Sequence, residues 1–195
     1  ISQNPHESLF QRMLTSGYVP FVILEDQYRV HWAIAAYPAV QFYSGRLLPA
    51  QVESPELPRG FSWPGSEPVA FVNVSGTLAL ERQYSSRRRV TYYNPAEARM
   101  VTDIISAMQS SDGYKDRSFA ILATTGRQVQ EIKEHLKTKR LYNLRAVGTI
   151  DNAQGYTYDI VLVSLVRSNT SGDLGIVADP RRLNVALSCA RSEEH

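Results

Sequence analysis

The second half of the chain alternates short apolar segments with amphipathic ones, and this alternation restricts the fold more than any other feature. The apolar runs SFAILAT (118–124) and DIVLVSLVRS (159–168) have the length of strands. GRQVQEIKEHLKTKR (126–140), which lies between them, spaces its apolar residues as an amphipathic helix does. Apolar strands that alternate with helices are typical of a mainly parallel sheet with helices on both faces. The sequence therefore predicts an α/β fold.

The remaining elements are predicted from caps, periodicity and helix breakers. A helix over 94–111 is the clearest, because Asn94 can cap it, Pro95 suits its first position and Glu97 its third. Further helices are predicted over 6–17, 32–43 and 180–191, and further strands over 19–30, 69–74 and 144–151. Pro38 is unfavourable inside the second of these helices, so we expect the helix to break or to start there. Five prolines between residues 48 and 68 predict a long irregular connection.

Composition excludes several classes of protein. The sequence has one cysteine and four histidines without zinc-ligand spacing, so we expect neither a disulfide framework nor a metal site. It shows no signal-peptide pattern and no apolar run near the roughly 20 residues of a membrane span, so we expect an intracellular protein, cytoplasmic or nuclear. A net charge of +2 indicates no nucleic-acid partner by itself. The basic clusters at Arg82 with 87–89 and at 133–145 can equally be solvated surface charge.

The sequence contains no glycine-rich phosphate-binding loop. Neither GxxxxGK[ST] nor GxGxxG occurs in it. We therefore expect this chain alone to bind no ATP. It can still supply arginines to a nucleotide that another domain holds.

Several motifs resemble, in order, those of the second RecA-like domain of superfamily 1 RNA/DNA helicases of the nonsense-mediated-decay type. DQYRVHWAI (26–34) is similar to the QYRMHP motif, and FYSGRL (42–47) to the FYxGxL that follows it. NPAEA (94–98) matches an N-x-x-E-A helix start. TIDNAQGYTYDIVLVSLVRSN (149–169) and LGIVADPRRLNVALSCAR (174–191) resemble TVDxFQGxExDxVIxSxVRSN and LGFLxDxRRLNVALTRAR. The matches cover nearly the whole chain.

The resemblance implies a RecA-like three-layer sandwich with a mainly parallel central sheet. It makes residues 1–195 a single C-terminal RecA-like domain, with the opening helix and the QYRxH motif in 1–47, the connection in 48–68 and the βαβ core in 69–195. The N-terminal RecA-like domain would lie outside this sequence. ATP and magnesium would bind between the two domains of the parent protein, whose other partner would be single-stranded RNA or DNA, with further protein partners possible.

The resemblance also assigns residues to roles. The catalytic candidates are Arg29, Gln154 and Arg191. The candidates for ATP binding are Gln27, Tyr28, Arg29, Gln154, Gly155 and Arg167. The candidates for nucleic-acid binding are Thr124, Thr149, Asp151, Ser168 and Asn184.

Simpler roles stay open for some of these residues. Arg29 can instead form an ion pair with Glu25 or Asp26, and the sequence AQG (153–155) can be an ordinary turn. Thr149 can simply be a strand-forming residue. The two arginines at 181–182 are unfavourable at a helix start without an acidic partner, and Asp179 is the candidate.

Four residues depart from the family pattern at functional positions. Cys189 stands where the family has a second arginine near the γ-phosphate, and Thr157 stands for a glutamate. Thr125 and Trp32 lie in motifs that lose a tyrosine and a proline. Loss of an arginine finger slows hydrolysis by orders of magnitude. These departures predict a weakened or lost ATPase.

Two functions of different classes therefore remain. The first is the second motor domain of an ATP-dependent RNA or DNA helicase. The alternative is a catalytically weakened helicase-like domain that clamps RNA or docks proteins. An unrelated α/β enzyme is a weaker third interpretation, because no nucleophile stands with a base and no carboxylate cluster occurs.

Overall fold

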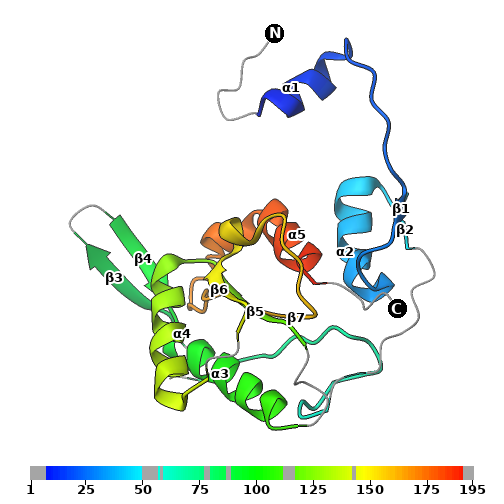
Figure 1. The fold of residues 1–195 in the computed structure, drawn as a ribbon. Coiled ribbons are helices and arrows are strands. Elements are labelled where there is room, and N and C mark those ends of the chain that lie inside the picture. Colours follow the sequence, from blue (N-terminus) through cyan, green and yellow to red (C-terminus); the bar gives the residue numbers. More distant parts are fainter. Residues whose placement is uncertain are drawn as a thin grey trace.

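A parallel three-stranded sheet lies at the centre of the chain (Figure 1). The structure is a computed structural model that describes residues 8–49, 57, 59–76, 80–86, 89–111, 117–141 and 144–190. The helices are α1 (Leu9–Ser16), α2 (Trp32–Tyr43), α3 (Pro95–Gln109), α4 (Gly126–Lys139) and α5 (Pro180–Ser188), with the 3-10 helices η3 (Ile150–Ala153) and η4 (Gly175–Ala178). The strands are β1 (Asp26–Gln27), β2 (Leu48–Pro49), β3 (Arg82–Ser86), β4 (Arg89–Tyr93), β5 (Phe119–Ala123), β6 (Ala146–Thr149) and β7 (Ile160–Ser164).

The central strand β5 organises the core because both of its faces are buried. It pairs in parallel with β6 on one side and with β7 on the other. Phe119 and Ile121 pack with the buried residues of α3 and α4, whereas Ala120 and Leu122 pack with those of η3 and α5. Successive side chains of a strand point to opposite faces, so one strand of small and branched residues supplies two cores.

The helices therefore form layers on the two faces of the sheet (Figure 1). The larger core lies between the sheet and the pair α3 and α4, and the smaller lies between the sheet and α5 with η3. This arrangement confirms the predicted α/β three-layer sandwich with a parallel sheet.

The structure confirms the predicted start of α3, which was the most specific helix prediction from the sequence. The Asn94 side chain accepts hydrogen bonds from the backbone N–H groups of Ala96 and Glu97, and Pro95 occupies the first turn of α3. Pro38, in contrast, does not break α2, which continues from Trp32 to Tyr43 with Pro38 buried inside it. The predicted break was therefore wrong.

Two predictions of strands were also wrong, one entirely and the other in its length. Residues 69–74 form no strand, and of residues 19–30 only Asp26–Gln27 pair, with Leu48–Pro49. Segment 69–74 instead lines an apolar cavity of about 460 Å³ that β7, α3 and α5 also border. A short apolar run indicates burial but does not supply a pairing partner, and that partner decides whether a strand forms.

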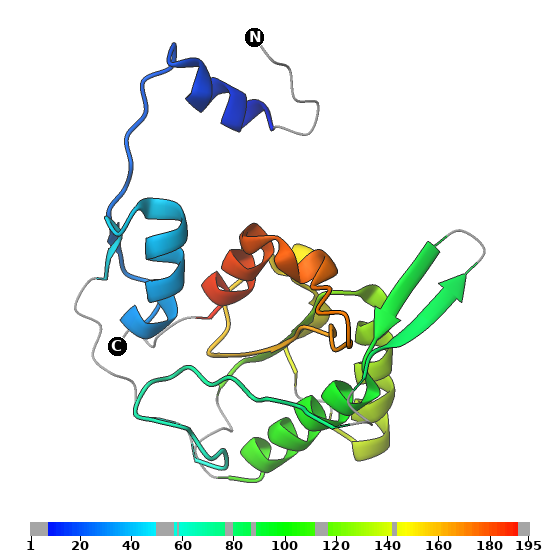
Figure 2. The same cartoon turned by 180° about the vertical axis from the view of Figure 1, so that it is seen from behind.

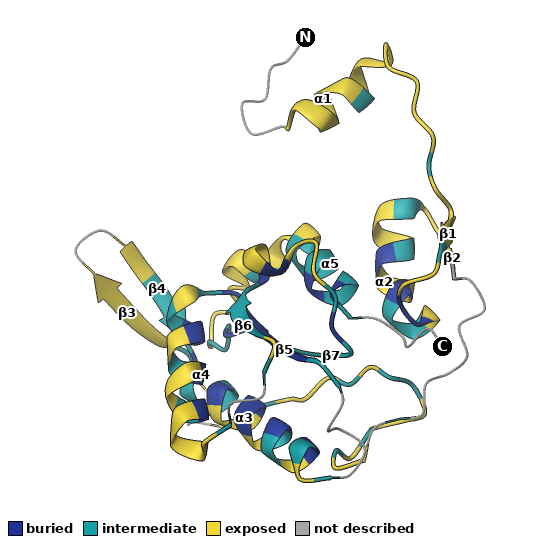
Figure 3. Ribbon diagram, in the orientation of Figure 1, coloured by how far each residue is buried: buried dark blue, intermediate teal, exposed yellow. Residues whose placement is uncertain are grey.

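The N-terminal part and the hairpin β3–β4 extend away from the sheet. Figure 2 shows both from behind, and Figure 3 shows that α1 is exposed along its length, with no buried residue. The antiparallel hairpin was not predicted, because its arginines and serines hide the alternation of a strand. Among the described residues, no helix has the length and apolar character needed to cross a membrane.

A buried polar network joins α3, α4 and β7. Gln128, fully buried on α4, accepts a hydrogen bond from the Asn94 N–H at 2.7 Å and donates to the Asn94 carbonyl and to Ser164 Oγ, both at 3.0 Å. Ser164 Oγ in turn donates to Glu97 Oε2 at 2.7 Å. Satisfied buried networks fix one arrangement of the elements they connect, because any other leaves polar groups without partners.

We predict that Gln128→Leu destabilises the domain by about 3 kcal/mol or more, because it removes the acceptor of the buried Asn94 N–H and the donor to the Asn94 carbonyl and to Ser164 Oγ. Gln130→Leu, on the exposed side of the same helix, should change the free energy of unfolding by less than about 0.5 kcal/mol. Urea unfolding followed by circular dichroism measures both. Equal effects of the two substitutions would show that the network does not stabilise the fold.

Candidate functional site at the two ends of the last helix

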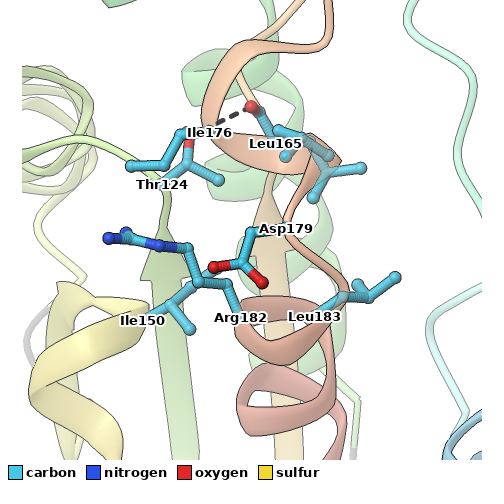
Figure 4. Close-up of a pocket in the computed structure, with 8 residues that line it drawn as sticks. Thr124, Ile150, Leu165, Ile176, Asp179, Arg182 and Leu183 are labelled. Atoms are coloured by element: carbon cyan, nitrogen blue, oxygen red, sulfur yellow. Dashed lines mark hydrogen bonds between the residues drawn. The ribbon is translucent and has the colours of Figure 1, made fainter. Parts of the chain in front are cut away.

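The carboxyl ends of β5 and β6 carry a first group of candidate residues, which we call the strand-end group: Thr124, Thr149 and Asp151. Thr124 follows β5, Thr149 ends β6, and Asp151 lies in η3 directly after it. Thr124 is nearly buried, and its hydroxyl donates to the Leu165 carbonyl at 3.0 Å, as Figure 4 shows. Asp151 is exposed, so it and Thr149 are the more accessible members.

The start of α5 borders this group. Arg182 donates to Asp151 Oδ2 at 2.9 Å, and it lines a small pocket together with Thr124, Ile150 and Asp179 (Figure 4). Asp179 caps α5 by accepting from the Arg181 N–H. The expectation that Asp179 neutralises the arginines is therefore wrong for Arg182, whose carboxylate partner is Asp151. Asn184, half-buried, lies further along α5.

The segment after β7 is held in a strained conformation. Val166 is fully buried and has φ +73°, a left-handed conformation that costs a β-branched residue about 1–3 kcal/mol. Its N–H donates to Glu97 Oε2 at 2.9 Å, and its carbonyl accepts from Asn94 Nδ2 at 3.3 Å. The N-x-x-E start of α3 therefore fixes the direction in which the next residue, Arg167, leaves the sheet.

Arg167 is engaged on all sides within the chain. Its guanidinium lies 3.1 Å from Glu81 Oε1 and 2.7 Å from Asp173 Oδ2, and it stacks over the ring of Tyr92 at 4.4 Å. Glu81 also accepts from the N–H of Ser168 at 2.8 Å. Arg167 therefore organises this loop, and both it and Ser168 lie at the carboxyl end of β7.

Sequence reasoning did not find Glu81 or Tyr92 as partners of Arg167. Glu81 is an isolated acidic residue before an unpredicted strand, and Tyr92 lies in that same hairpin. The sequence offered only one indication of these contacts. An arginine directly after an apolar strand, as in the VRSN segment, needs a carboxylate partner if it is buried.

A second group of candidates, which we call the cleft group, consists of Arg29, Gln154 and Gly155 beside Cys189. The turn that follows η3 holds Gln154 at φ −57° and ψ 127° and Gly155 at φ +89°, and the Tyr156 N–H donates to the Ala153 carbonyl. These are features of a type II turn, which requires glycine at its third position. The Gln154 side chain is exposed and makes no hydrogen bond within the described residues. Residues 153–156 therefore form a turn that presents the glutamine outward, a conformation compatible with either interpretation of this segment.

The QYR segment (27–29) lies just before α2, and α2 contacts α5. Gln27 shapes its own loop, because its Oε1 accepts from the N–H groups of Arg29 and Val30 and its Nε2 donates to the Val30 carbonyl. Tyr28 and Arg29 are exposed. The hydrogen bonds of Gln27 therefore hold the loop in a conformation that leaves Tyr28 and Arg29 exposed to solvent.

Cys189 is buried beside the turn that carries Gln154 and Gly155. It is 1% exposed, and its Sγ lies 3.4 Å from the carbonyl of Ala153, directly before Gln154. Burial raises the pKa of its thiol, and the nearby positive charge of Arg29 opposes that shift. A thiol with a raised pKa stays protonated at neutral pH and is a poor nucleophile.

The two groups lie at opposite ends of α5. Its start lies beside Thr124 at the carboxyl end of β5, whereas its end is joined to the amino end of β7, where the Tyr158 N–H donates to the Cys189 carbonyl at 2.8 Å. Arg167 thus lies at the strand-end side, away from the other ATP-binding candidates. Arg191 lies outside the described residues. Among the described residues, no group of three or more potential ligands could hold a metal ion.

Comparison with known proteins gives the family. The profile of the AAA domain family matches residues 6–194. This chain belongs to that family. It is 31% identical to "Regulator of nonsense transcripts 1 homolog" of Arabidopsis thaliana, 33% identical to "Putative regulator of nonsense transcripts 1" of Takifugu rubripes and 31% identical to "ATP-dependent helicase NAM7" of Saccharomyces cerevisiae. Each alignment covers 95% of this chain. The chain is a domain of the superfamily 1 helicases of the nonsense-mediated-decay type, as its motifs indicated.

The relatives are much longer proteins. The chain spans 15%, 17% and 19% of the lengths of these three. Their whole-protein activities therefore depend largely on sequence that this chain does not contain.

We predict that Cys189→Arg destabilises the domain by about 3 kcal/mol or more, because the position is buried against a backbone carbonyl and a packed core. Cys189→Ala should cost only about 1 kcal/mol. Urea unfolding of both variants measures the difference. If Cys189→Arg is as stable as the original chain, the end of α5 has room for an arginine directed outward.

Proposed function

We propose that this chain is the second motor domain of an ATP-dependent RNA or DNA helicase. The observation that supports this most is the cleft group: Cys189 packs against the turn that carries Gln154 and Gly155, and α2, which follows the QYR segment, contacts α5. In family order these motifs surround the γ-phosphate of ATP bound on the preceding domain. ATP with magnesium would bind between the domains of the parent protein.

The exposed residues of the cleft group fit charge stabilisation. Arg29 offers a rigid guanidinium fork, which can neutralise charge on the transferred phosphoryl group without any proton transfer. Gln154, on its glycine-supported turn, can orient a water molecule or donate to a phosphate oxygen. Gly155 lets the backbone approach closely, because it has no side chain.

The strand-end group is proposed to carry part of the nucleic-acid track. The carboxyl edge of the sheet offers hydroxyl, carboxylate and amide groups from Thr149 and Asp151 of this group and from the neighbouring Ser168 and Asn184. The third member, Thr124, donates a hydrogen bond to the Leu165 carbonyl at the same edge. Hydroxyls and amides contact sugars and phosphates without reading sequence. Binding should therefore tolerate many sequences of single-stranded RNA or DNA.

A helicase-like clamp without turnover is the second candidate, and Cys189 favours it. Where the family pattern has a second arginine near the γ-phosphate, this chain has Cys189, whose thiol is buried, so Arg29 would be the arginine that the described part of this site offers. Such a domain can still close on nucleic acid or dock proteins. The two candidates differ in whether ATP is hydrolysed.

We predict that Arg29→Ala lowers nucleic-acid-stimulated phosphate release by the two-domain parent protein about 1,000-fold, on the scale of arginine-finger effects. Arg145→Ala, which removes an exposed arginine near the amino end of β6, should leave the rate within about two-fold, because surface charges that far away are screened. A parent protein with no hydrolysis above background would favour the clamp. An Arg29→Ala variant as fast as the control would contradict the proposed role of Arg29.

A further inference from the structure

The hairpin β3–β4 has one face on which cationic and aromatic side chains alternate. The register pairs Arg82 with Tyr93, Tyr84 with Thr91 and Ser86 with Arg89. Residues directly opposite each other in an antiparallel pair lie on the same face of the ribbon. Arg82, Tyr84, Arg89 and Tyr93 therefore share a face, which we call the hairpin face.

Arg127 of α4 extends the hairpin face at its base. Its guanidinium lies 4.8 Å from the centre of the Tyr93 ring and 5.5 Å from that of Tyr84. It is also paired with Glu131 at 2.9 Å, so it contributes little free charge and chiefly orders the two rings. Tyr84 nevertheless remains 48% exposed.

The charges of Arg82, at the base of the hairpin, and of Arg89, near its outer end, are not neutralised by the part of the chain that the structure describes. Neither Arg82 nor Arg89 forms a salt bridge with any carboxylate in the described residues, and both are exposed. In the sequence, Arg87 and Arg88 fall between the two strands, outside the described residues.

Packing of the two cores does not explain the exposed arginines and Tyr84 of the hairpin. All five residues of β3 are exposed, and neither strand adds a residue to either buried core. A lone two-stranded ribbon is only marginally stable in water. The contacts at its base, such as the 2.8 Å hydrogen bond from Thr125 Oγ1 to the Tyr92 carbonyl, hold it in place without requiring arginines further out.

We propose that the hairpin face binds single-stranded nucleic acid, with phosphates on Arg82 and Arg89 and a base stacked on Tyr84. Positive charge interleaved with exposed aromatic rings is the chemistry that holds unpaired strands, because phosphates need cations and unstacked bases need a flat apolar partner. Thr125 at the base of the hairpin follows Thr124 of the strand-end group, so the face continues that edge of the sheet. The inference deepens the nucleic-acid part of the proposed function and does not depend on the ATP site.

The test is the affinity of the 195-residue chain for labelled oligo(U) and oligo(dT), measured without nucleotide by fluorescence anisotropy over a range of salt concentrations. The double substitution Arg82→Gln with Arg89→Gln should weaken binding at least ten-fold. It should also reduce the slope of log K against log salt by about 1.4, at roughly 0.7 per phosphate contact. The matched control, Lys133→Gln with Lys137→Gln on the exposed side of α4, removes the same charge and should change the affinity less than about two-fold.

Tyr84 separates stacking from charge. Tyr84→Ala should weaken binding about ten-fold, and Tyr84→Phe should restore it, because stacking requires the ring and not the hydroxyl. Circular dichroism verifies that each variant is folded. Since the substituted side chains are exposed, the unfolding midpoints should stay close to that of the original chain.

Three results would overturn the proposal. An unchanged affinity in the arginine double variant would do so even if the strand-end group still bound nucleic acid, and the proposed function would then survive. Equal weakening by the α4 control would show that the effect is only net charge. No binding by the original chain at low salt would overturn both this inference and the nucleic-acid part of the proposed function, while hydrolysis by the parent would remain a separate test of the ATP site.

Discussion

The buried hydrogen-bond network around Gln128 is the constraint on which the candidate site depends. It joins the start of α3, the first turn of α4 and the end of β7 with hydrogen bonds between 2.7 and 3.0 Å. Through Glu97 and Asn94 it also holds Val166 at positive φ, which determines where Arg167 and the loop after it lie. Residues from separate sequence motifs thus belong to one hydrogen-bonded network at the carboxyl edge of the sheet.

Helix α5 separates the two groups of candidate residues. Its start contributes Arg182 to the strand-end group, and its end places Cys189 beside the cleft group. A rigid helix between the two groups means that movement at one end must be accompanied by movement at the other. This geometry is what a motor domain requires, because ATP-driven closure must shift the nucleic acid. The same geometry serves a clamp, in which closure alone matters.

The sequence predicted the parts of the fold that rest on local physical signals. The alternation of buried strands and amphipathic helices gave the layers, and Asn94 with Pro95 gave the start of α3. It could not predict that residues 69–74 pair with nothing or that Pro38 lies inside a helix, because both depend on tertiary neighbours. For the site, motif order indicated Arg29 and Gln154, whereas the burial of Cys189 and the partners of Arg167 and Arg182 depend on contacts between distant segments.

The central claim is that this chain completes an ATP site that another domain begins. Calorimetry of the chain mixed with the N-terminal RecA-like domain of its parent tests it most directly, with a non-hydrolysable ATP analogue compared against ADP. If Arg29 and Gln154 contact the γ-phosphate, the analogue should strengthen association of the two domains at least ten-fold over ADP, because a ligand stabilises the state that binds it better. Equal association with both nucleotides would contradict the account.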